Sequence, residues 1–95
     1  MPEQLIDNTT RHRYEYLAEG ATSFIDYRRS DGVIALTHAE VPRELEGHGI
    51  GSRMTRAVLD AIRATGEKVL PQCPFVEVFM RRHPEYQDLL VPPTH

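Results

Sequence analysis

One stretch of the sequence, from Val41 to Gly66, constrains the fold more than any other. It holds three glycines at alternate positions, Gly47, Gly49 and Gly51, and then a run in which apolar residues recur every three or four positions. That spacing predicts an amphipathic helix that starts among the glycines and ends at Gly66. Backbone N–H groups at a helix start have no partner within the helix and lie at its positive end. The stretch therefore predicts a turn and helix start that are a candidate anion site.

Before this helix, the sequence predicts an antiparallel meander of three strands. Residues 11–18 and 22–29 alternate with a period of two, which is typical of strands. Residues 33–38 are more apolar and suit a central strand that is buried on both faces. The Asp-Gly pair at 31–32 favours a hairpin turn between the last two strands. The apolar pair at 5–6 fits either a first edge strand or a tether.

After the helix, residues 68–70 predict a short strand, which makes a β-α-β unit with a parallel and right-handed connection. Pro74 suits the first position of a second helix over residues 75–82, and Pro84 ends it. Phe75 is expected on the core-facing side of that helix. The order β-β-β-α-β-α indicates an α+β (mixed α/β) fold.

Composition bounds the remaining possibilities. With 95 residues, of which 40% are hydrophobic and 26% charged, the chain suits one domain over 1–95, with a loosely ordered tail at 91–95. A net charge of −3 argues against nucleic acid as a partner. The single cysteine and the lack of a signal or spanning segment favour a cytoplasmic protein with no membrane partner. The histidines lack ligand spacing, so no metal is expected, and the size suits a monomer or weak homodimer.

The glycine turn at 47–51 does not identify a ligand by itself. A nucleotide P-loop would need a Gly-Lys-Ser/Thr sequence that the chain lacks. A dinucleotide site would need an acidic residue at the end of the next strand, and that strand ends in Leu70-Pro71. The residues alone therefore leave two interpretations open, a phosphate-binding turn and a helix start that needs glycine for packing.

Several segments together resemble the compact YjdJ-type branch of the GNAT N-acetyltransferase superfamily. They are residues 36–42, residues 45–51 with the helix after them, residues 73–75 (Cys-Pro-Phe) and residues 82–86 (Arg-His-Pro-Glu-Tyr). The resemblance covers residues 11–90, approximately. It implies a compact GNAT-like fold in which the parallel strands on either side of the long helix splay apart. It also implies a protein that binds acetyl-coenzyme A (acetyl-CoA).

The resemblance assigns coenzyme-binding roles to residues of this chain. The pyrophosphate would lie on the turn and helix start, with Ser52 as a hydroxyl donor and Arg53 near the phosphates. The pantetheine arm would lie between the strand end at 38–41 and residues 70–73. Where the superfamily motif opens with a cation or an amide, this chain has Glu46, which is unfavourable beside a phosphate unless it points away. The implied set is Val41, Gly47, His48, Gly49, Ile50, Gly51, Ser52 and Arg53.

The implied reaction is transfer of an acetyl group from acetyl-CoA to an unidentified amine, either directly or through Cys73. Cys73 precedes a helix start, which favours a thiolate nucleophile, and the splayed-strand arrangement would put His38 beside it as a base. A buried, inert cysteine and a solvated histidine are the alternative. Two other functions stay open. One is a non-catalytic acyl-CoA-binding or sensing module, and the other is a protein-interaction domain without coenzyme.

Overall fold

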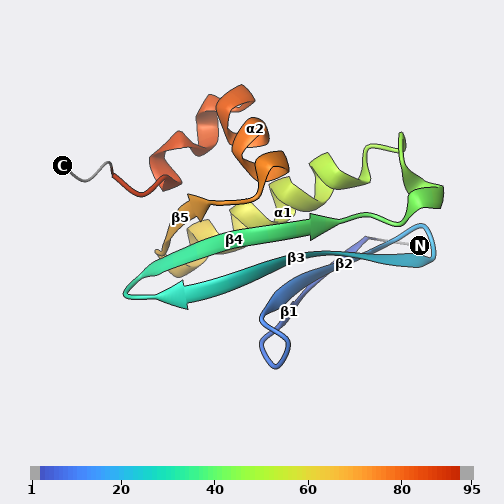
Figure 1. Ribbon diagram of the computed structural model, residues 1–95, viewed down its shortest axis with the longest axis horizontal. Helices are drawn as coiled ribbons and strands as arrows, with labels where there is room; N and C mark the ends of the chain where they lie inside the picture. The colour runs from blue at the N-terminus through green and yellow to red at the C-terminus, as the bar shows by residue number, and fades with distance from the viewer. Residues whose placement is uncertain (1–2, 93–95) are drawn as a thin grey trace.

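The structure is a computed structural model that describes residues 3–92. A single mixed sheet runs in the order β1-β2-β3-β4-β5, in which the first four strands are antiparallel neighbours and the last two are parallel. Figure 1 shows this sheet beneath the helices. The meander and the β-α-β unit predicted from the sequence are confirmed, and the apolar pair at 5–6 belongs to an edge strand. The strands are β1 (Gln4–Asn8), β2 (Arg13–Ala18), β3 (Ala21–Ser30), β4 (Val33–Glu40) and β5 (Lys68–Pro71).

Two α-helices and two short 3-10 helices complete the fold. They are η1 (Arg43–Leu45), α1 (Ile50–Thr65), α2 (Pro74–Arg82) and η2 (Pro84–Leu89). Gly49 caps the start of α1 and Gly66 its end, both in the left-handed conformation, with φ of 78° and 81°. Glycine adopts this conformation without the cost that a Cβ imposes, so the sequence fixes both ends of the helix. The predicted boundaries of α1 and the position of Pro74 in α2 are confirmed.

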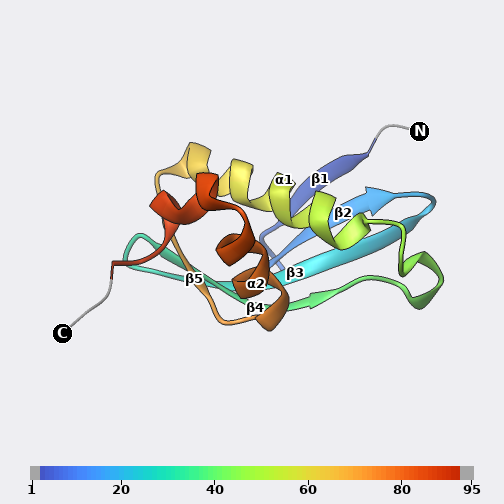
Figure 2. The same ribbon diagram turned by 90° about the horizontal axis from the view of Figure 1, so that it is seen from above.

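The helices cover only one face of the sheet (Figure 2). Along β4, Ile34 and Leu36 are fully buried, whereas Val33, Ala35 and Thr37 are partly exposed. The prediction that this strand is buried on both faces is therefore wrong, because within residues 3–92 no helix packs on its second face. The core lies between the covered face and α1, whose buried residues are Ile50, Met54, Thr55, Val58, Leu59 and Ile62.

A β-bulge in the β3–β4 pair changes which residues of β4 face the helices. Tyr27 pairs with Leu36, but its neighbour Asp26 pairs with His38, so Thr37 is an extra residue. Because side chains alternate between the two faces, one extra residue exchanges the faces for the rest of the strand. Beyond the bulge, Ala39 therefore lies on the helix side and His38 on the open face of the sheet.

The parallel strands separate at the same level. Pairing of β4 with β5 ends at Leu36 and Pro71. The N–H groups of Gln72 and Cys73 then both donate to the Leu36 carbonyl, at 3.0 and 2.9 Å, and the chain turns into α2. Since β4 continues along β3 to Glu40, β4 and β5 splay apart beyond Leu36, as the family resemblance implied.

Candidate functional site

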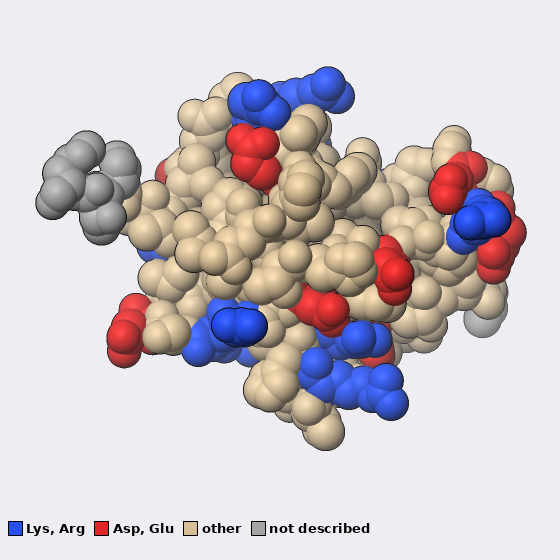
Figure 3. All heavy atoms as spheres, in the orientation of Figure 1, with Lys and Arg blue, Asp and Glu red and all other residues tan. Residues whose placement is uncertain are grey.

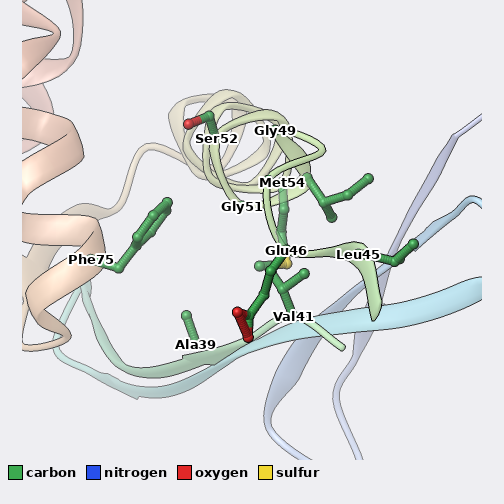
Figure 4. Close-up of a pocket in the computed structure, with 11 residues that line it drawn as sticks. Ala39, Val41, Leu45, Glu46, Gly49, Gly51, Ser52, Met54 and Phe75 are labelled. Atoms are coloured by element: carbon green, nitrogen blue, oxygen red, sulfur yellow. The ribbon is translucent and has the colours of Figure 1, made fainter. Parts of the chain in front are cut away.

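An open cleft of about 400 Å³ lies where these strands separate, between the end of β4, the turn before α1 and the start of α2. Figure 4 shows its walls, with Phe75 of α2 facing the glycine turn across the opening. The floor is formed by the helix side of β4 beyond the bulge. The lining residues are Ala39, Val41, Leu45, Glu46, Gly47, Gly49, Ile50, Gly51, Ser52, Met54 and Phe75.

The backbone of the turn presents hydrogen-bond donors to this cleft. Gly47 and Gly49 have φ of 86° and 78°, a region in which a side chain is strained. The N–H of Arg53 is the first in α1 to bond back, to the Gly49 carbonyl at 3.2 Å. No side chain caps the helix start. The N–H groups of Ile50 to Ser52 are thus free of intrahelical partners, and the helix dipole makes this end attractive to anions.

Glu46 brings a negative charge into the same cleft. Its side chain lies among the lining residues, and its carboxylate extends toward Ala39 (Figure 4). The carboxylate thus lies inside the cleft on its β4 side, across from the helix start at Gly51 and Ser52. Figure 3 shows no continuous basic patch on the face in view, where Lys and Arg are interspersed with Asp and Glu. On this face, therefore, no basic patch adds to the backbone donors of the turn.

Six of the eight predicted coenzyme-binding residues line the cleft, and two do not. His48 turns outward, with its Nδ1 at 2.8 Å from a Glu19 carboxylate oxygen. Arg53 pairs with Glu3 and Glu19, at 2.8 and 3.4 Å, and donates to the His48 carbonyl at 2.9 Å. The hydrogen bond from Arg53 lowers the pKa of Glu3, and that from His48 lowers the pKa of Glu19. The side chains of His48 and Arg53 thus tie the glycine turn to residues beside the sheet and lie outside the cleft lining.

The structure does not bring the two predicted catalytic residues together. Cys73 is buried in the core, with 5% of its surface exposed, and is absent from the cleft lining. His38 lies on the open face, where its ring centroid is 6.2 Å from that of Phe24 and its Nε2 is 3.6 Å from a Glu40 oxygen. The bulge turns His38 to the open face of the sheet, away from the core that holds Cys73, so the two side chains do not form the predicted pair in this structure.

Three lining residues were missed by sequence reasoning: Leu45, Met54 and Phe75. Met54 follows Ile50 by one helical turn, so its periodicity is a usable signal. Phe75 was misplaced, because its spacing of four from Phe79 suits a core face. In the structure Phe75 is 45% exposed, while Val76, Phe79 and Met80 fill the core.

The described part of the chain has neither a metal-binding cluster nor a membrane-spanning helix. Within residues 3–92, His, Cys, Asp and Glu side chains do not gather in groups of three that could hold a metal ion. The helices in that range are also too short or too polar to cross a membrane.

Comparison with known proteins identifies the family. The profile of a family described as GCN5-related N-acetyl-transferase matches residues 13–89. Among solved structures, the chain is similar to the NMR solution structure of a GCN5-like protein from Staphylococcus aureus, with a TM-score of 0.71 and 24% identity over 97% of this chain and 91% of that one. No curated protein gave a significant match. The matched segment contains the whole cleft, and the chain belongs to the GCN5-related N-acetyltransferase (GNAT) family.

Proposed function

We propose that the cleft binds acetyl-CoA and that the protein transfers the acetyl group to an amine. One observation carries the proposal. Ile50, Gly51 and Ser52, whose N–H groups have no intrahelical partner, line a cleft that opens where β4 and β5 separate. Such a helix start suits a pyrophosphate, and membership of the GNAT family implies use of acetyl-CoA.

Some residues of the cleft favour binding of the acetyl-CoA phosphates, and others do not. Gly47 and Gly49 keep Cβ atoms away from the turn, so a phosphate can approach the backbone closely. Glu46 opposes the same phosphates through its charge, and Arg53 is engaged by Glu3 and Glu19. We therefore expect binding that is weaker than an Arg or Gln at position 46 would give.

In this proposal each wall of the cleft has a distinct task. The turn and the start of α1 hold the pyrophosphate through backbone N–H groups, and the Ser52 hydroxyl supports them. The exposed edge of β4 near Ala39 and Val41 holds the pantetheine arm, and the Phe75 ring covers it from α2. Acetyl-CoA supplies an activated thioester, and the chain contributes orientation and exclusion of water on the helix side of the sheet.

Direct attack of the amine is favoured over transfer through Cys73. The thiol is buried, does not line the cleft and lies on the other side of the sheet from His38. A relay would need the start of α2 to move before the thiol could reach a thioester. Direct attack predicts that Cys73→Ala keeps most of the turnover and that no acetylated protein accumulates when amine is omitted.

The test is release of coenzyme A from acetyl-CoA in the presence of a panel of amines, with intact-mass analysis of the protein. Amine-dependent release with an unmodified protein supports direct transfer. A mass increase of one acetyl group, lost in Cys73→Ala together with turnover, supports the relay and overturns direct attack. Cys73→Ser serves as a second variant, because it preserves the volume of the buried side chain.

A non-catalytic acyl-CoA-binding or sensing module is the second candidate. The observation that favours it is Glu46 in the cleft, which weakens retention of the coenzyme. Saturable acetyl-CoA binding without turnover for any amine would select this function. Absence of binding to the folded protein would leave a protein-interaction domain.

A further inference from the structure

The hairpin between β2 and β3 holds a glutamate in a backbone conformation that does not suit it. Its two-residue turn is Glu19-Gly20, with φ of 53° and 77°, between the paired residues Ala18 and Ala21. Positive φ at both positions defines a type I′ turn, which strongly prefers Asn, Asp or Gly at its first position. Glu19 is therefore strained, because in the left-handed region its Cβ lies too close to the following carbonyl oxygen.

The hairpin between β3 and β4 has the same turn with a better suited residue. Asp31 and Gly32 have φ of 50° and 77°, and they lie between the paired residues Ser30 and Val33. Aspartate tolerates the left-handed region because its short side chain can hydrogen-bond to the nearby backbone. The two hairpins thus have matching backbones, but Asp31 suits its turn and Glu19 does not.

The Glu19 carboxylate extends from its own turn to the glycine turn before α1. One oxygen lies 2.8 Å from Nδ1 of His48, and the other accepts a hydrogen bond from Nη2 of Arg53 at 3.4 Å. His48 stands between Gly47 and Gly49, 29 positions after Glu19 in the sequence. The strained residue therefore supplies a contact between two turns that are distant along the chain.

Arg53 adds a second contact to the same turn. Its Nη1 donates to the His48 carbonyl at 2.9 Å, and its Nη2 pairs with Glu3 at 2.8 Å. Glu3 in turn accepts a hydrogen bond from the hydroxyl of Tyr16, whose side chain is buried. The guanidinium thus links the backbone of the glycine turn to two carboxylates, those of Glu3 and Glu19.

The glycine turn benefits from such a restraint more than an ordinary loop does. Gly47 and Gly49 have φ of 86° and 78°, and glycine has more backbone freedom to lose than any other residue. A ligand that binds a mobile turn must also order it, so a turn already held in the binding shape binds more tightly. Neither His48 nor Arg53 lines the cleft, so both can order the turn without occupying the place of a ligand.

We propose that Glu19 is a positioning residue for the coenzyme, and that it holds the glycine turn in its phosphate-binding shape through His48 and Arg53. The inference rests on the proposed binding of acetyl-CoA. Strain of this kind persists where the surrounding contacts require it, and here those contacts are made by the carboxylate. A residue that suits the hairpin but lacks the carboxylate should therefore raise stability and lower affinity for the coenzyme.

The first test replaces Glu19 by Asn, with Asp31→Asn at the matching position of the other hairpin as the control. Asn suits a type I′ turn, so Glu19→Asn should raise the midpoint of chemical denaturation. In calorimetry the same variant should bind acetyl-CoA about fivefold more weakly, since the ion pairs that it loses are exposed. Asp31→Asn should leave the affinity unchanged.

The sign of the change in affinity separates positioning from a general effect of charge. Both variants remove a negative charge from a chain of net charge −3, which by itself favours binding of an anionic ligand. Unchanged or tighter binding in Glu19→Asn would therefore overturn the proposal. A fall of midpoint and affinity together would also overturn it, because Glu19 would then serve the stability of the fold.

A double-variant cycle tests whether Glu19 acts through the glycine turn. His48→Ala should weaken acetyl-CoA binding about as much as Glu19→Asn does. If the two residues act on one another, the double variant should lose clearly less affinity than the sum of the two single losses. Losses that simply add would contradict an action through His48.

The motion of the turn gives a readout that needs no ligand. In the 15N-labelled full chain, NMR order parameters of residues 47–51 should fall in Glu19→Asn and stay at their wild-type values in Asp31→Asn. Calorimetry on the wild type separates this role from the proposed function. Absence of acetyl-CoA binding to the folded wild type would remove both. Binding to the wild type, with neither order parameters nor affinity changed in Glu19→Asn, would remove the positioning role alone.

Discussion

A Cβ atom at Gly51 would lie 2.9 Å from the tip of the Phe75 ring. Gly51 sits inside α1, where its backbone conformation does not require glycine. The glycine is needed because α2 presents Phe75 against the start of α1, at the edge of the cleft. The two residues together set the width of the cleft at the point where the helices approach.

Replacing Gly51 by Ala should push the Phe75 ring toward the cleft. The ring is 45% exposed and can rotate, and alanine favours a helix, so we expect the free energy of unfolding to change by less than about 1 kcal/mol. Acetyl-CoA affinity should fall about tenfold, which corresponds to about 1.4 kcal/mol. Calorimetry on Gly51→Ala, Phe75→Ala and the double variant measures this. If the two effects simply add, the residues do not act on one another.

Replacing Glu46 by Gln should strengthen acetyl-CoA binding, because it removes a carboxylate from the cleft without changing its shape. One exposed charge beside a phosphate is worth about 1 kcal/mol, or roughly a fivefold change in Kd. The gain should shrink as salt is added, since ions screen exposed charges. Glu44→Gln, which alters charge outside the cleft, should have a much smaller effect. Equal gains for both variants would indicate a general charge effect.

Gly49→Ala and Gly20→Ala form a matched pair for stability. Both glycines have positive φ, 78° and 77°, but only Gly49 lines the cleft. Left-handed backbone costs alanine about 1–2 kcal/mol, so both variants should lower the free energy of unfolding by that amount. An added Cβ at Gly49 also meets the Arg53 guanidinium at 3.3 Å, whereas Gly20 has open space. Chemical denaturation measures this change. Unchanged stability in either variant would show that an alanine at that position is not strained by the left-handed backbone.

Tyr27 should make the fold less stable in strong alkali. Its burial, and then its hydrogen bond to Asp7, raise the pKa of the Tyr27 hydroxyl to about 12 from an ordinary value of about 10. Above pH 10 the unfolded chain loses this proton and the folded protein keeps it. Stability is thus fully present below pH 10 and falls as pH rises toward 12. Between pH 10 and pH 12, denaturation midpoints should fall less in Tyr27→Phe than in the wild type. An equal fall in the two proteins would show that Tyr27 does not cause the loss of stability.

Much of the fold could be predicted because its local signals agree. The left-handed caps at Gly49 and Gly66 fix α1, and strand alternation places Ile25 and Tyr27 in the core. The Asp-Gly turn at 31–32 lies between β3 and β4 as predicted. These features depend on neighbouring residues in the chain, so they can be recognised without knowledge of distant contacts.

The wrong predictions arise where contacts between residues far apart in the sequence determine the direction of a side chain. The bulge that exchanges the faces of His38 and Ala39 depends on the register between β3 and β4, which no local pattern reveals. His48 and Arg53 turn outward because Glu19 and Glu3 lie within reach after folding. The positions of the cleft backbone were therefore predictable, but the directions of its side chains were not.

The most direct test of the central claim is a calorimetric titration of acetyl-CoA into the wild type, Gly49→Ala and Gly20→Ala. The account predicts saturable binding to the wild type and to Gly20→Ala, with binding at least tenfold weaker in a folded Gly49→Ala, because Gly49 lines the cleft and Gly20 does not. Equal affinities in all three proteins would show that the ligand binds elsewhere. No heat of binding in the folded wild type would remove the coenzyme function altogether.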